Sequence, residues 1–155
     1  MVIDNFNYNF NFSGTYSHTI DGKNRFLFPS RLREILDKFN VKDLLITAAL
    51  PSEQYLLIFP EIVFQDYIKS WMSVDKGQRN PENVLIERWF RSNAFPVQLD
   101  KVGRILIPQN LLEEKKIQKN IYLIGNGNKI EIWDKEVFEN ELSRMRETLT
   151  NLKIE

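Results

Sequence analysis

The sequence of 155 residues contains no cysteine, which excludes disulfide bonds, thiolate metal sites and cysteine nucleophiles. Its single histidine, His18, leaves little room for a Ser-His-Asp triad and has no second histidine with which to form a metal site, so we interpret it as an ordinary strand residue. No apolar run approaches the roughly 18 residues of a membrane-spanning helix, and the first residues lack the pattern of a secretory signal. These absences predict a cytoplasmic protein that is not an enzyme and uses no metal or cofactor.

An excess of positive charge is also missing, because 21 basic residues balance 21 acidic ones. Nucleic-acid-binding proteins usually carry a basic surplus. The charge is uneven along the chain, however. Residues 13–36 carry four basic and two acidic side chains, whereas residues 134–155 carry four basic and six acidic ones. The neutral total can therefore conceal a polarised molecule, and any nucleic-acid interpretation must rest on local charge.

An internal repeat organises the chain. Asp21–Pro29 (DGKNRFLFP) aligns with Asp100–Pro108 (DKVGRILIP) at an offset of 79 residues, with Asp, Arg, Leu and Pro identical. Average residue usage would give only about half a match over this length. Each half predicts the order strand, turn, strand, short helix, two strands and a longer helix. No linker-like stretch separates the halves, so we expect one intertwined domain.

Local signals define the elements of each repeat. Asn24 and Gly103 occupy equivalent turn positions, and both residue types favour positive φ, so we expect a left-handed residue at each. Pro29 and Pro108 favour the start of the short helices that follow. Asn126-Gly127 predicts a tight hairpin turn, since this dipeptide suits two-residue loops.

Further signals lie outside the repeated motif. Asp134 is a good N-cap for a final helix, and helical patterns cover residues 62–72 and 81–91. Residues 5–12 alternate Asn with aromatic residues, which suits either a flexible tail or an added edge strand. Since termini are usually poorly ordered unless tied down, we expect residues 1–11 to be dispensable for folding.

The repeated Asp-x-x-x-Arg motif has two interpretations. In the first, Asp caps the turn and pairs with Arg, and no ligand is involved. In the second, Asp orients the Arg outward, where its rigid fork of donors suits phosphates and guanine edges. The lysines of the same turns, Lys23 and Lys101, are either surface charges or part of this site. Arg31 and Arg33 are interpreted as a solvated helix face.

Three segments closely resemble MraZ proteins: residues Gly14–Arg25, Leu99–Pro108 and Ile124–Asp134. The resemblance covers about residues 12–146 and includes both repeats. It implies an α+β fold in which two tandem AbrB-like (SpoVT-AbrB) swapped-hairpin β repeats form one β-barrel-like core with flanking helices. The implied limits are an N-terminal extension at 1–12, a domain at 13–146 with repeats at about 13–72 and 95–146, and a tail at 147–155.

The resemblance also implies a function. MraZ-like proteins are DNA-binding transcriptional regulators of the division and cell-wall gene cluster, act at their own promoter and assemble into rings. The implied partners are therefore double-stranded DNA, at promoter direct repeats, and further copies of the chain. No membrane association is implied. The implied location is the cytoplasm, in association with the nucleoid. The implied DNA-binding residues are Lys23, Arg25, Lys101 and Arg104, supported by Asp21, Asn24, Asp100 and Gly103.

Two departures from the family pattern and two alternatives accompany this interpretation. Residues 1–11 extend beyond the usual start, and Asn24 stands where the family usually has Gly. One alternative is a ring-forming structural or protein-binding module without specific DNA binding. The other is a DNA-binding antitoxin, which fits less well because such chains usually carry one motif and a toxin-binding tail. Salt dependence of duplex affinity discriminates, because phosphate contacts release counterions.

Overall fold

The computed structural model describes residues 9–73 and 80–153. The first repeat contains, in chain order, β1 (Phe12–Thr19), β2 (Arg25–Leu27), α1 (Ser30–Lys38), β3 (Leu44–Ala48), β4 (Tyr55–Pro60), the 3-10 turn η1 (Glu61–Val63) and α2 (Phe64–Ser70). Helix α3 (Pro81–Ser92) follows. The second repeat contains β5 (Phe95–Val97), β6 (Arg104–Leu106), α4 (Gln109–Glu114), β7 (Asn120–Gly127), β8 (Lys129–Asp134) and α5 (Lys135–Thr150).

The strands of the two repeats interleave. The larger sheet is antiparallel and has the order β1-β7-β8-β4-β3-β5. The first strand of each repeat pairs with a strand of the other repeat, β1 with β7 and β5 with β3, and β4 meets β8 in the middle. The order is therefore symmetric: equivalent strands of the two repeats lie at equal distances from the centre of the sheet. This arrangement makes one intertwined unit, as the lack of a linker predicts.

The resemblance implies a β-barrel-like core, and this expectation is wrong. In the described part of the chain the six-stranded sheet is open, with β1 and β5 at its edges. The short strands β2 and β6 pair with each other as a separate two-stranded ribbon, so they do not join those edges and close a barrel. The architecture is a mixed α+β fold with an open antiparallel sheet and a ribbon.

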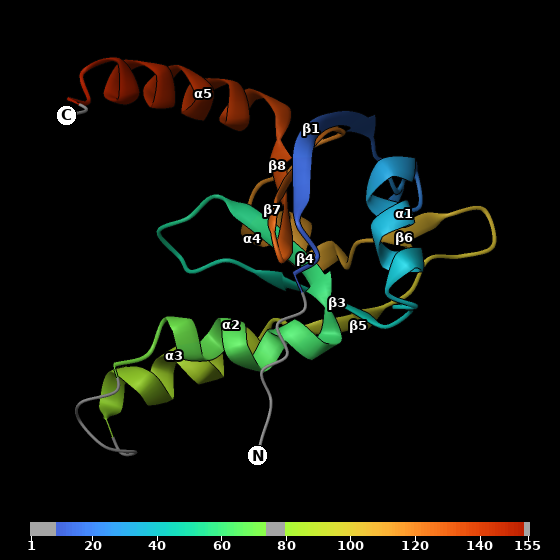
Figure 1. Cartoon of the computed structure of the whole chain (residues 1–155), viewed down its shortest axis with the longest axis horizontal. Coiled ribbons are helices and arrows are strands. Elements are labelled where there is room, and N and C mark those ends of the chain that lie inside the picture. Colours follow the sequence, from blue (N-terminus) through green and yellow to red (C-terminus); the bar gives the residue numbers. More distant parts are fainter. Residues whose placement is uncertain (1–8, 74–79, 154–155) are drawn as a thin grey trace.

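Apolar residues cover both faces of the central sheet. Successive residues of a strand point to opposite faces, and in β4 the residues on both faces are apolar and buried. Leu56 and Ile58 join a core that includes Phe26 and Ile105 of the ribbon. Leu57 and Phe59 join a second core with residues of α2, α3 and α5. The first core thus anchors the ribbon on the sheet together with α1 and α4, while α2, α3 and α5 pack on the second (Figure 1).

Several local predictions are confirmed and two need adjustment. Helices α1 and α4 begin directly after Pro29 and Pro108. The β7–β8 hairpin exists, but Asn126 pairs with Lys129, so its two turn residues lie one position later than the sequence indicates. Asp134 occupies the N-cap position of α5, yet its side chain makes no cap hydrogen bond and instead accepts from the backbone N–H of Gln118 at 2.8 Å.

The two ends of the chain contribute differently to the fold. Phe10 and Phe12 are buried in the first core, with 2% and 1% of their surface exposed, so the end of the N-terminal extension packs on the domain. The alternating stretch at 5–12 falls partly outside the described residues. Helix α5 begins at the end of β8 and points away from the sheets (Figure 1). No helix in residues 9–73 and 80–153 is long and apolar enough to cross a membrane.

Candidate nucleic-acid interface

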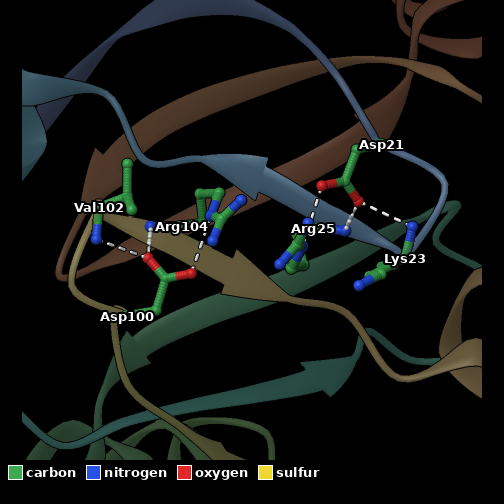
Figure 2. A network of polar contacts seen from close by, with 6 residues as sticks. All are labelled: Asp21, Lys23, Arg25, Asp100, Val102 and Arg104. Atoms are coloured by element: carbon green, nitrogen blue, oxygen red, sulfur yellow. Dashed lines mark hydrogen bonds and ion pairs between the residues drawn. The ribbon is translucent and has the colours of Figure 1, made fainter.

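Each repeat contains a turn in which one aspartate carboxylate organises the neighbouring donors. In the first turn, Oδ1 of Asp21 accepts from the backbone N–H groups of Lys23 and Arg25 at 2.9 Å each, and Oδ2 accepts from Nε of Arg25 at 2.9 Å. In the second turn, Oδ1 of Asp100 accepts from the N–H groups of Val102 (3.0 Å) and Arg104 (2.8 Å). Oδ2 of Asp100 accepts from Nε of Arg104 at 2.8 Å (Figure 2). The two turns thus share one hydrogen-bond pattern.

The backbone closes both turns in the same way. The N–H of Asp21 donates to the carbonyl of Arg25 at 2.8 Å, and the N–H of Asp100 donates to the carbonyl of Arg104 at 2.9 Å. Asn24 and Gly103 have φ of 62° and 93°, which confirms the left-handed residue predicted at this position. Asn tolerates this conformation better than most non-glycine residues. The Asn24 departure therefore preserves the shape of the turn.

The environments of the two left-handed residues differ. The Asn24 side chain donates from Nδ2 to Oε1 of Gln109 at 2.8 Å, a contact from the first repeat to α4 of the second. Gly103 has no side chain, and a Cβ built there would lie 2.6 Å from Nη1 of Arg33 on α1. Arg33 therefore reaches the second turn from the first repeat, although the sequence suggests only a solvated helix face for it.

The ribbon of β2 and β6 holds the two turns at its opposite ends (Figure 2). Phe26 pairs with Ile105 at the centre of the ribbon, and both side chains are buried on its inner face. The flanking pairs are Arg25 with Leu106 and Leu27 with Arg104. Because side chains alternate along a strand, these four residues share the outer face of the ribbon. The ribbon consequently presents both motif arginines on one surface.

Electrostatics keep the carboxylates charged and the arginines oriented. The backbone N–H of Arg25 is the largest influence that lowers the pKa of Asp21, and desolvation partly opposes it. The backbone N–H of Arg104 lowers the pKa of Asp100 in the same way. Nε of each arginine is held by its aspartate, whereas Nη1 and Nη2 of Arg25 and Arg104 have no hydrogen-bond partner within the described residues. The outer ends of both forks are therefore available for bidentate recognition of a phosphate or a guanine edge.

The predicted lysines lie in the same turns but not at equivalent positions. Lys23 aligns with Val102, and Lys101 aligns with Gly22. Lys23 and Lys101 are both exposed. The structure therefore brings all four predicted basic residues, Lys23, Arg25, Lys101 and Arg104, to the ribbon and its two turns. Among residues 9–73 and 80–153, no group of three or more His, Cys, Asp or Glu side chains could hold a metal ion.

Sequence reasoning missed the leucines of this surface. Leu27 and Leu106 share the outer face with the arginines and are 50% and 53% exposed. The signal was present, because the Arg-x-Leu spacing in two short strands places Arg and Leu on the same face. Only the burial of Phe26 and Ile105 shows which face is outside.

Comparison with known proteins identifies the class and the family. The MraZ protein family, described as antitoxin-like, matches residues 11–82 and 90–153. A transcriptional regulator MraZ of Ureaplasma urealyticum serovar 10 is 34% identical over 141 residues, which are 91% of this chain and 93% of the relative. Those of Mesoplasma florum and Acetivibrio thermocellus are 32% and 35% identical over 83% of this chain, and over 84% and 85% of their own lengths.

These relatives share one class, since each is named a transcriptional regulator. The chain belongs to the MraZ family.

Proposed function

We propose that this protein is a sequence-specific DNA-binding regulator that acts on the promoter of the division and cell-wall gene cluster, including its own gene. The observation that carries the proposal is a pair of aspartate-held arginines on one face of a two-stranded ribbon, whose Nη atoms have no hydrogen-bond partner in the described part of the chain. The major groove of B-DNA, about 12 Å wide, admits such a ribbon, and Arg bound to guanine O6 and N7 is its commonest specific contact. The choice of promoter follows from the family resemblance.

Further details of the proposal concern the assembly. The interleaved strands support an AbrB-like swapped-hairpin arrangement of the two repeats, with the ribbon as the DNA-facing element. The chain is neutral overall, so a single ribbon offers few phosphate contacts. We propose that a ring-shaped homo-oligomer multiplies these contacts over several direct repeats and keeps the protein at the nucleoid.

The test compares promoter binding by three proteins. Footprinting first locates the protected sequence, and mobility shifts then measure affinity for the wild type, Arg25→Ala and Arg144→Ala. Loss of a base-reading arginine costs about 1–3 kcal/mol per site. Arg25→Ala should therefore bind a single-repeat duplex about fivefold to 150-fold more weakly. Arg144→Ala removes the same charge from α5, where the side chain is 68% exposed, and should bind like wild type.

The structural alternative gives a different result in the same assay. If the Asp21–Arg25 pair only holds the turn, Arg25→Ala and Asp21→Ala lower the melting temperature together, and binding falls only as unfolding proceeds. Circular dichroism and size exclusion separate these outcomes. A folded Arg25→Ala protein with wild-type operator affinity would refute the assignment. Failure of the wild type to protect any duplex would favour a structural or protein-binding ring.

A further inference from the structure

The outer face of the ribbon combines charge and apolar surface in a regular pattern. Leu27 lies opposite Arg104, and Leu106 lies opposite Arg25, so each arginine has a leucine as its cross-strand neighbour. The leucines are 50% and 53% exposed, whereas Phe26 and Ile105, which lie between Arg and Leu along each strand, are buried. Scattered exposed leucines are normal on protein surfaces. Two at equivalent positions of a repeat, each beside an outward-facing arginine, form a defined recognition face.

The charges around this face select its occupant. Within the described residues the Nη atoms of Arg25 and Arg104 have no hydrogen-bond partner, and Lys23 and Lys101 lie in the adjoining turns. The carboxylates of Asp21 and Asp100 already accept hydrogen bonds from the arginines and the turn backbone. The face therefore suits an anionic partner that also offers small apolar groups at close spacing. In the major groove of duplex DNA, the thymine C5-methyl is the group of that kind.

Ribbon geometry agrees with the spacing of base pairs. Antiparallel neighbours on one face are about 4.5–5.5 Å apart, and diagonal neighbours are about 7–8 Å apart. Base pairs are stacked about 3.4 Å apart. Arg25 and Arg104 form one diagonal of the face and Leu27 and Leu106 form the other. Each diagonal therefore spans about two base-pair steps, and each leucine can address a base next to the one that its neighbouring arginine reads.

We propose that Leu27 and Leu106 are specificity-determining residues that contact thymine methyl groups beside the guanines read by Arg25 and Arg104. This inference rests on the proposed DNA-binding function and adds a second base to the sequence that each ribbon reads. A guanine contact alone tolerates any neighbouring base pair. An apolar contact favours thymine there, because only thymine places a methyl group in the major groove.

Deoxyuridine provides the test, because it differs from thymidine only by the missing methyl group. Single-repeat duplexes with the footprinted sequence are prepared with each protected thymine replaced in turn by deoxyuridine. Removing one buried methyl should weaken wild-type binding about threefold to fivefold at the contacted positions. Leu27→Ala and Leu106→Ala should bind the thymine duplex more weakly by a similar factor. Each should then show no further loss at the position that its leucine contacts.

The loss of sensitivity in the ribbon variants separates a methyl contact from changes in DNA stiffness and hydration, and a control variant shows that it requires truncation of a ribbon leucine. Leu149→Ala truncates a leucine that is 60% exposed on α5, and it should keep the full sensitivity to deoxyuridine. Wild-type protein that binds thymine and deoxyuridine duplexes equally at every position overturns the inference and leaves the proposed function standing. Leucine variants that alter the oligomeric state but not the deoxyuridine sensitivity also overturn it, because the face would then join copies of the chain. Wild-type protein that binds no duplex overturns both proposals.

Discussion

At the residue scale, one carboxylate in each turn both closes the turn and orients an arginine. The carboxylate of Asp21 accepts three hydrogen bonds from its own turn, and that of Asp100 does the same. Of each guanidinium, only Nε takes part, and Nη1 and Nη2 have no hydrogen-bond partner among residues 9–73 and 80–153. The two interpretations of the Asp-x-x-x-Arg motif are therefore compatible, since the pair that closes the turn also fixes the direction of the guanidinium. Preorganisation of this kind reduces the ordering cost of binding.

The lowered pKa of both aspartates predicts a pH dependence of stability. Because the pKa of each carboxyl is lower in the folded state, its stabilising contribution is fully present above the unfolded-state value of about 3.9. The contribution is lost as the pH falls from there through the folded-state value. Urea unfolding at pH 7, 5 and 3.5 should show wild-type stability falling more steeply at the acid end than that of an Asp21→Asn/Asp100→Asn variant. Parallel curves for the two proteins would contradict this assignment of the shifts.

At the element scale, local signals predicted the turns and the short helices but not the pairing of strands. Positive φ at Asn24 and Gly103 and helix starts after Pro29 and Pro108 depend on neighbouring residues alone, so the sequence contains them. The pairing of β1 with β7 joins residues about a hundred positions apart, and no local pattern specifies that partner. Residue periodicity therefore could not predict the open sheet or the separate ribbon.

The site shows the same division between local and long-range information. The repeat identifies Arg25 and Arg104, and the β2–β6 pairing brings them to one face. The contact of Arg33 with the Gly103 turn crosses between repeats and depends on tertiary packing. Arg33 has no equivalent in the second repeat, where Leu112 occupies the aligned position. The sequence predicts which side chains form the candidate site, and tertiary structure determines their neighbours.

The N-terminal extension yields a prediction about element stability. Phe10 is 2% exposed, stacks against Phe12 with ring centroids 5.7 Å apart and meets Phe39 edge-on at 4.9 Å. Phe10→Ala should lower the free energy of unfolding by about 3 kcal/mol, the lower end for a buried phenylalanine because a chain end detaches easily. Chemical denaturation measures the change, and Asn9→Ala, at an exposed neighbour, should stay within about 0.5 kcal/mol of wild type. Equal stability of all three proteins would mean that residues 1–11 are dispensable for folding after all.

At the scale of the whole molecule, neutral charge limits what one chain can do on DNA. The 21 basic residues balance the 21 acidic ones, and the basic groups of the candidate site are concentrated around one small ribbon. Each phosphate contact contributes a salt-dependent increment, and a ribbon with few such contacts has a shallow salt slope. Specific regulation with such an interface requires several ribbons on one duplex. The proposed ring meets this requirement if its subunits reach successive repeats together.

The last prediction tests that requirement directly. Linked sites raise avidity by about 10² to 10⁴ when the geometry allows simultaneous contact, so a duplex with two promoter repeats should bind far more tightly than one with a single repeat. Inserting about 5 base pairs between the repeats turns the second one to the opposite side of the helix and should remove most of the gain. Inserting about 10 restores its direction and should recover part of it, since a B-DNA turn contains 10–10.5 base pairs. Equal affinity for one and two repeats, together with a monomer mass at micromolar concentration, would show that each chain acts alone, and the operator would then have to be read by one ribbon.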